Sequence, residues 1–298
     1  MRFAFVTTFV SISVLAAAQG NAPTGKDWPI YSPGAQAAIE GLIGGSGTGS
    51  AGTGQILFHG GPVMGTVAGS GGTSPINIYY IWYGNWSSLD PTAQTILNTL
   101  ANGIGGSPYF NISTTYYDSL NNHVLNAVSF PKFVTDNYSQ GTSLKDTGPT
   151  GSVAAVVRGH IGVDLPLDAN GIYFVLTTPD VNETSGFCTS YCGWHSYLTL
   201  NNVNVKYAYI GDPLRCPGAC EFQNIGPNGN GGGDGMASII AHELEEATTD
   251  PQLNAWFFAS GNENADQCAW TFGSMSTASN GAKYNMTLEA EQIGRAHV

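Results

Sequence analysis

The pattern of apolar and polar positions predicts two kinds of element along this chain, strands and helices. Stretches that are almost continuously apolar and rich in aromatic or β-branched residues predict buried strands. The clearest are INIYYIWYGNW at 76–86, GIYFVLTTPD at 171–180 and KYAYIGDP at 206–213. We expect the first to be a central strand, because it has no polar face. PYFNISTTYYD and NAVSFPKFVTD favour strands or extended chain, and SVAAVVRGHIG suits a helix or a strand equally.

Two other segments carry the helical period. The first, PTAQTILNTLANGIGG at 91–106, follows Asp90 as a predicted N-cap and ends at glycines. The second lies at 233–251, with Asp234 as its predicted N-cap and with Pro251 preventing continuation beyond Asp250. Strands that precede a helix of this kind predict an α+β fold, in which a mixed β-sheet packs against helices.

The apolar face of the second helix contains a carboxylate. Glu243 lies in the middle of this face, and His242 and Glu246 flank it one turn apart. An unpaired buried charge costs several kcal/mol, on the order of 3–5, so Glu243 must be paired, protonated or bound. The three residues form HExxE, a variant of the zincin motif HExxH in which a carboxylate replaces the second imidazole. The chain has only 21 acidic residues in 298, which makes this concentration of acids informative.

The spacing of HExxE suits a metal ion. His242 and Glu246 can hold one ion from adjacent turns, and Glu243 points to the side where an attacking water would lie, as a general base does. The third ligand is expected from GNENADQC at 261–268, where Asp266 and Glu263 are both candidates. We expect Zn²⁺. Because two carboxylates with one imidazole make the ion a weaker Lewis acid, other divalent metals become competitive, and the site can be catalytic or structural.

The two ends of the chain differ from its middle. MRFAFVTTFVSISVLAAAQG predicts a secretory signal peptide at 1–18, and the Gly-, Pro- and Ser-rich stretch 19–54 predicts a flexible arm or linker. Residues 55–290 then form a single predicted domain. Back-translation of EQIGRAHV at 291–298 contains a common sequencing-library adapter. We therefore expect this tail to be non-native and the natural C-terminus to be missing.

Composition narrows the class of protein. Nine lysines and arginines against 21 acids give a formal net charge of −12, which argues against a nucleic-acid partner. Only 10% of residues are charged, and there are 40 glycines. No apolar stretch after the signal peptide is long enough to predict a membrane span. Sequons at Asn85, Asn111, Asn137, Asn182 and Asn285 fit a secreted glycoprotein.

Cysteine spacing leaves two interpretations open. Cys188 with Cys192 and Cys216 with Cys220 form two Cx₃C pairs, which can be a zinc knuckle or disulfides. Secretion favours disulfides, although the pairing cannot be deduced and Cys268 is left over. His195, close behind the first pair, can reach the metal from a disulfide-pinned loop.

Several longer motifs carry a resemblance. They are FHGGPVM at 58–64, IYYIWYGNW, YFVLTTPDV, FCTSYCGWH, CPGAC and PNGNGGGDGM. Together they resemble the phosphate-induced protein 1 (EXORDIUM-like) family from about Gly54 to Asn285. The resemblance implies a secreted, wall-associated protein without an established reaction. HExxE followed by TDP, Trp256 and NExxDxC looks like a microbial-type member with a zincin-like helix.

Two functions therefore follow as expectations. In the first, the protein is a secreted zincin-like hydrolase, a peptidase, that acts on a peptide or cell-wall substrate. In the second, it is a non-catalytic extracellular or cell-wall-associated protein in which the same residues hold a structural ion or form a polar core. The sequence does not indicate the substrate or the oligomeric state.

Overall fold

A computed structural model describes residues 55–67, 72–221, 226–269, 274–277, 280–281 and 283–285. The predicted signal peptide, the arm at 19–54 and the tail at 291–298 lie outside these residues, so the proposed domain boundaries remain predictions.

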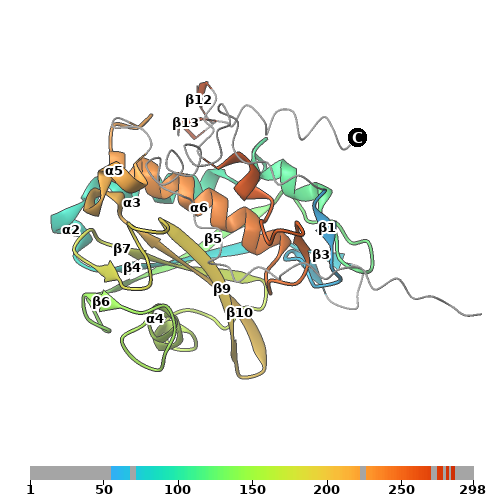
Figure 1. Cartoon of the computed structure of the whole chain (residues 1–298), viewed down its shortest axis with the longest axis horizontal. Helices are drawn as coiled ribbons and strands as arrows, with labels where there is room; N and C mark the ends of the chain where they lie inside the picture. The colour runs from blue at the N-terminus through green and yellow to red at the C-terminus, as the bar shows by residue number, and fades with distance from the viewer. Residues whose placement is uncertain are drawn as a thin grey trace, which may run out of the picture.

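A five-stranded sheet with the order β5-β4-β7-β10-β9 forms the centre of the fold (Figure 1). Its strands are β4 (Ile76–Tyr83), β5 (Val128–Asp136), β7 (Gly171–Thr177), β9 (Gly193–Leu200) and β10 (Val203–Gly211). Neighbouring strands are parallel except for β9, which runs antiparallel to β10 at the edge. β4 lies between two strands, as expected from its continuous apolar sequence.

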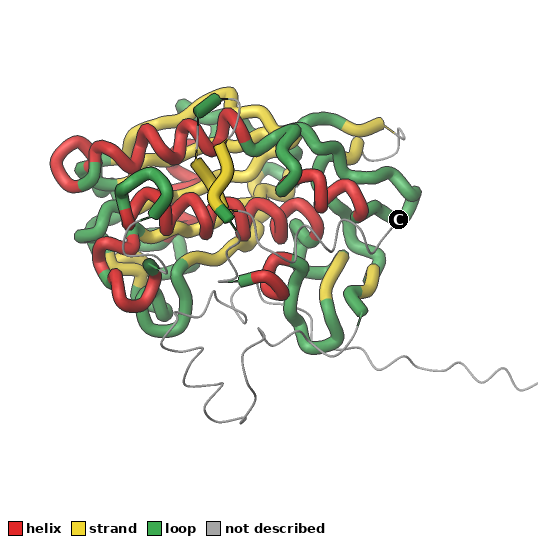
Figure 2. Tube along the Cα trace, turned by 90° about the horizontal axis from the view of Figure 1, so that it is seen from above, coloured by secondary structure: helices red, strands yellow, loops and turns green. Residues whose placement is uncertain are grey.

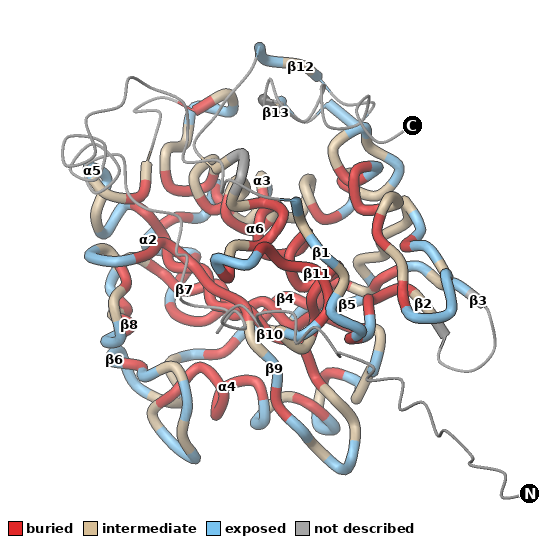
Figure 3. The backbone as a smooth tube through the Cα atoms, turned by 45° about the vertical axis from the view of Figure 1, so that its right-hand side comes forward, coloured by how far each residue is buried: buried red, intermediate tan, exposed pale blue. Residues whose placement is uncertain are grey.

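Helices cover both faces of this sheet. α3 (Pro91–Gly103) and α6 (Gly231–Thr249) pack against each other on one face, and α4 (Val153–His160) lies on the other. Figure 2 looks down onto the face with the longer helices. α6 contacts β9, β10 and β7, and most of its residues are buried (Figure 3). A mixed sheet packed with helices confirms the α+β prediction.

The ends of α3 and α6 agree with the sequence predictions, except at the N-cap of α6. Asp90 caps α3 as predicted, accepting the backbone N–H of Ala93. The prediction of Asp234 as the N-cap of α6 is wrong, because Asn230 caps the helix by accepting the N–H of Gly233. The glycines after Asn230 allow an earlier start, since a Cβ on Gly233 would lie only 3.0 Å from a backbone atom of α3. α6 ends before Pro251, as expected.

Local side-chain hydrogen bonds explain where strand prediction failed. The stretch 108–118 contains the 3₁₀ helix η1 (Phe110–Thr115), not a strand. The hydroxyl of Ser107 accepts the N–H of Phe110, and Thr114 and Thr115 donate to carbonyls three residues earlier. These short polar side chains compete with strand pairing. The ambiguous stretch at 152–162 is helix α4, capped by Ser152.

The remaining elements are short. They are β1 (Leu57–Phe58), β2 (Thr66–Val67), β3 (Gly72–Thr73), β6 (Ser143–Leu144), β8 (Asn182–Glu183), β11 (Trp256–Phe257), β12 (Met275–Thr277), β13 (Lys283–Asn285), α2 (Trp86–Leu89), α5 (Pro217–Cys220), η2 (Pro213–Arg215) and η3 (Ala265–Cys268). None of the helices in the described part of the chain has the length and apolar character needed to cross a membrane.

Candidate metal centre

Three parts of the chain meet where α6 crosses the edge strand β9. α6 contributes His242, Glu243 and Glu246, and the segment that follows it contributes Glu263 and Asp266. β9 contributes His195. Their side chains are between 1% and 8% exposed. The result is a buried cluster of two imidazoles and four carboxylates, which we call the six-residue cluster.

One half of this cluster is the ligand set expected from the sequence. The Nε2 atom of His242 lies 2.9 Å from Oε1 of Glu246 and 3.7 Å from Oδ1 of Asp266. These residues offer donor atoms that all lie within 4.8 Å of one another. Asp266 also accepts the backbone N–H of Glu263 at 2.8 Å, which closes a turn within the segment that carries both acids. We call this group the His242 triad.

The other half centres on His195. Its Nδ1 atom lies 3.2 Å from Oε2 of Glu243 and 3.6 Å from Oε2 of Glu246, and these residues form a second group of donors within 4.8 Å of one another. We call this group the His195 triad. Glu263, the alternative third ligand for the predicted ion, faces His195 instead, with Oε2 at 3.8 Å from Nε2.

The sequence held only a weak signal for His195. Its place close behind Cys192 allows it to reach the site, but the contact depends on β9 pairing with β10 and packing under α6. Gly193, two residues earlier, permits this close approach, because a Cβ there would collide with Ile239 of α6. Such a tertiary contact cannot be deduced from local spacing.

Several polar atoms of the six-residue cluster have no hydrogen-bond partner within the described part of the chain. They are Nε2 of His195, Oε1 of Glu246 and Oε1 of Glu263. The short contact between His242 and Glu246 therefore lacks hydrogen-bond geometry, although its atoms are 2.9 Å apart. Leaving a buried polar atom unpaired costs about 1–3 kcal/mol. In the His242 triad the donor atoms thus converge without hydrogen-bonding one another, which is the arrangement that a metal ion requires.

Burial dominates the electrostatics of the cluster. It raises the pKa values of Glu246, Glu263 and Asp266 well above the usual range, and the neighbouring carboxylates raise them further. Burial alone would lower the pKa of His195, but the hydrogen bond and charge of Glu243 raise it overall. The ion pairs of these carboxylates in the described chain are all with histidines. Protons or a metal must therefore compensate their charge.

Two buried acids beside the cluster have other partners. Glu245 accepts a hydrogen bond from the side chain of Asn264, and burial raises its pKa to about 7. Asp250 accepts the backbone N–H groups of Asn254 and Ala255, which closes the turn after α6. Neither belongs to a triad.

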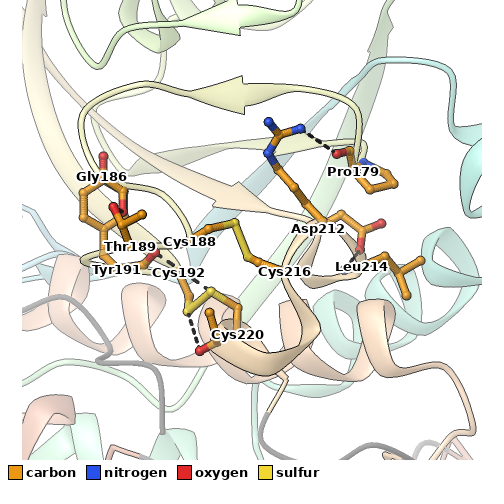
Figure 4. Close-up of a disulfide and its surroundings, with 12 residues drawn as sticks. Pro179, Gly186, Cys188, Thr189, Tyr191, Cys192, Asp212, Leu214, Cys216 and Cys220 are labelled. Atoms are coloured by element: carbon orange, nitrogen blue, oxygen red, sulfur yellow. Dashed lines mark hydrogen bonds between the residues drawn. A yellow bond between two sulfur atoms is a disulfide. The ribbon is translucent and has the colours of Figure 1, made fainter. Parts of the chain in front are cut away.

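Two disulfides anchor the segment that leads into β9 (Figure 4). Cys188 pairs with Cys216 and Cys192 pairs with Cys220, each across 28 residues. The disulfide prediction is thus confirmed, and the zinc-knuckle alternative is wrong, because these cysteines offer no thiolate to a metal. The side chain of Cys268 lies outside the described residues. Disulfides form in oxidising compartments, so the pairs are consistent with an extracellular protein.

Comparison with known proteins identifies relatives of this chain in plants. EXORDIUM-like 5 of Arabidopsis thaliana is 30% identical over 248 residues, which cover 74% of this chain and 65% of the relative. EXORDIUM-like 3 of the same plant is 29% identical over 252 residues, covering 74% and 70%. The PHOSPHATE-INDUCED 1 protein of Nicotiana tabacum is 24% identical over 211 residues, covering 61% and 63%.

The chain thus spans about two thirds of the length of these relatives. No solved structure matches it. The family model described as the phosphate-induced protein 1 conserved region matches residues 56–293. Because this match covers most of the chain, the protein belongs to the phosphate-induced protein 1, or EXORDIUM-like, family.

Proposed function

We propose that this protein is a secreted metal-dependent hydrolase, a peptidase, whose divalent ion is held by His242, Glu246 and Asp266. The observation that carries the proposal is the convergence of one ring nitrogen and two carboxylate oxygens within 4.8 Å of one another. The unpaired Oε1 of Glu246 supports it, because this buried oxygen has no hydrogen-bond partner in the described chain. Zn²⁺ is the expected ion, and the carboxylate-rich donors also suit other divalent metals.

In this proposal, Glu243 is the proton acceptor and His195 positions it. A divalent ion held there would supply Lewis-acid chemistry: it would polarise a substrate carbonyl and lower the pKa of a water so that hydroxide is available to attack that carbonyl. Glu243 lies next to a metal ligand on α6, and its Oε2 is 3.2 Å from Nδ1 of His195. This contact fixes the carboxylate on the side facing β9, where it can take a proton from the attacking water.

Burial favours a second candidate function. Ligand side chains of the His242 triad are at most 8% exposed, whereas a catalytic ion keeps a position open to substrate. A non-catalytic extracellular or cell-wall-associated protein, in which the ion stabilises the junction of α6 with the segment after it, accounts for this burial directly.

Metal analysis combined with a peptidase assay separates these functions. The full chain, secreted from a eukaryotic host, is analysed for metal by mass spectrometry and assayed on a peptide library, together with Glu243→Gln. Cleavage by the parent and loss of cleavage in Glu243→Gln, with metal retained in the variant, supports the hydrolase. Metal in a parent that cleaves nothing supports the structural ion. A parent without metal contradicts both.

Glu245→Gln is the matched control. Glu245 is a buried glutamate of the same helix, but its carboxylate accepts from Asn264 and contributes no donor to either triad. This variant should keep the metal and the cleavage activity of the parent. Equal loss of activity in the two variants would indicate damage to α6 rather than removal of a proton acceptor.

A further inference from the structure

The six-residue cluster contains more donors than one ion requires, and they fall into two triads that share one residue. We infer that the cluster binds two divalent metal ions, one in the His242 triad and one in the His195 triad, with Glu246 as their shared ligand. This inference rests on the proposed function for the first ion. It replaces the roles given there to Glu243 and His195, which become ligands of the second ion.

The two oxygens of Glu246 face different histidines. Oε1 lies 2.9 Å from Nε2 of His242, and Oε2 lies 3.6 Å from Nδ1 of His195. Each triad offers one ring nitrogen and two carboxylate oxygens within 4.8 Å of one another. Donors about 2.0–2.4 Å from a single ion can be at most about 4.8 Å apart, so each triad is compact enough for its own ion.

Charge favours two ions over one. The four carboxylates of Glu243, Glu246, Glu263 and Asp266 carry a formal charge of −4, and one divalent ion between neutral histidines leaves −2 in a buried site. Two divalent ions bring the formal charge to zero. Protons are a poorer solution, because a protonated carboxyl must donate a hydrogen bond. Oε1 of Glu246 and Oε1 of Glu263 have no partner within the described chain.

The donor composition also fits a pair of ions. Carboxylate-bridged helical proteins hold two iron or manganese ions with four carboxylates and two imidazoles, and the two triads supply three such carboxylates and both imidazoles. Glu263 has a separate place in this arrangement, since its Oε2 lies 3.8 Å from Nε2 of His195, the ring nitrogen that faces away from the triad. These two atoms form no hydrogen bond within the described chain, so Glu263 would have to move closer to Nε2 to orient His195 as a metal ligand. The oxygen-rich set favours Mn²⁺, Fe²⁺ or Zn²⁺.

The second ion changes the expected behaviour of Glu243. With one ion, Glu243 is a proton acceptor and Glu243→Gln leaves the metal content unchanged. With two ions, Glu243 holds the second ion, and the same substitution removes one metal of two. Metal stoichiometry thus separates the two roles without any activity measurement.

The test is metal stoichiometry of the full chain loaded with Mn²⁺ and measured by native mass spectrometry. We expect two ions in the parent and in Glu245→Gln, and one ion in His195→Gln, Glu243→Gln and Asp266→Asn. One ion in the parent, unchanged in His195→Gln, would overturn the second site and leave the proposed function standing. No ion in the parent would overturn both.

Spectroscopy of the parent keeps the inference testable where a buried substitution prevents folding. Two Mn²⁺ ions that share a carboxylate are magnetically coupled, and the electron paramagnetic resonance spectrum of the loaded parent should show that coupling. The six-line spectrum of isolated Mn²⁺ at full loading would contradict the shared site.

Discussion

Asp266 and Glu263 are neighbouring buried acids that face different histidines. Asp266 lies 3.7 Å from His242, and Glu263 lies 3.8 Å from His195. Only Asp266 belongs to a triad. We therefore predict that Asp266→Asn weakens binding of the ion in the His242 triad about a hundredfold or more. Glu263→Gln should cost about tenfold, as loss of a partner outside the ligand set does. Competition with a chromophoric chelator measures both, and equal losses would contradict the assignment.

Local spacing explains which residues of the cluster sequence reasoning could find. His242, Glu243 and Glu246 lie within two turns of one helix, so the helical period alone places them on one side. Asp266 lies on the segment after this helix, and the chain needs to reverse direction only once to bring it back to the helix. His195 sits on β9, and it reaches Glu243 only through strand pairing and helix packing. Its role in the cluster is therefore a tertiary property that its sequence neighbourhood does not reveal.

At the scale of elements, α4 ends at a titratable histidine, His160, that contacts two carboxylates. His160 lies 3.0 Å from Asp136 through Nε2 and 2.9 Å from Asp164 through Nδ1. The hydrogen bond to Asp136 raises the pKa of His160, and it outweighs the burial that would lower it. Burial raises the pKa of Asp136, but hydrogen bonds from His160 and Ser139 lower it overall.

This contact predicts a pH-dependent contribution to stability. A histidine whose folded pKa is raised contributes fully below its unfolded pKa of about 6.5, and the contribution is lost as pH rises through the folded value. His160→Gln should therefore lower the free energy of unfolding more at pH 5.5 than at pH 8.5. Urea denaturation at both pH values measures this, with the exposed His123→Gln as control. A larger loss at the higher pH would contradict the pairing.

The two disulfides differ in burial. Cys192 and Cys220 are at most 1% exposed, whereas Cys188 and Cys216 are partly buried. Replacing either pair with serines should lower the free energy of unfolding by about 2–4 kcal/mol, because each bridge closes a loop of 28 residues. The Cys192/Cys220 variant should fall at the upper end, since it buries two hydroxyls. Urea denaturation compares the pairs, and a larger loss for the partly buried pair would contradict this ranking.

For the whole molecule, the distance between β9 and α6 determines whether His195 reaches Glu243 and Glu246. The sequence predicted the central strand, the two long helices, the N-cap of α3 and the α+β class, because each depends on a local period or cap. It did not predict the order β5-β4-β7-β10-β9. That order places β9 at the edge under α6, and strand order depends on contacts between distant segments.

Gly193 tests this dependence on distance. A Cβ at this position would collide with Ile239 of α6 and lie 2.9 Å from the carbonyl oxygen of Tyr209. Gly193→Ala should therefore push α6 away from β9 and lower the free energy of unfolding by about 1–3 kcal/mol. It should also weaken metal binding, because His195 lies on β9 whereas Glu243 and Glu246 lie on α6.

Gly218→Ala is the control, because nothing lies within 4 Å of a Cβ at Gly218 on α5. Its free energy of unfolding should stay within about 0.5 kcal/mol of the parent value. Urea denaturation and metal stoichiometry of both variants complete the test. If Gly193→Ala lost stability but kept the full metal content, the separation of β9 and α6 would not control the cluster. If it lost metal with unchanged stability, the effect would be local to His195.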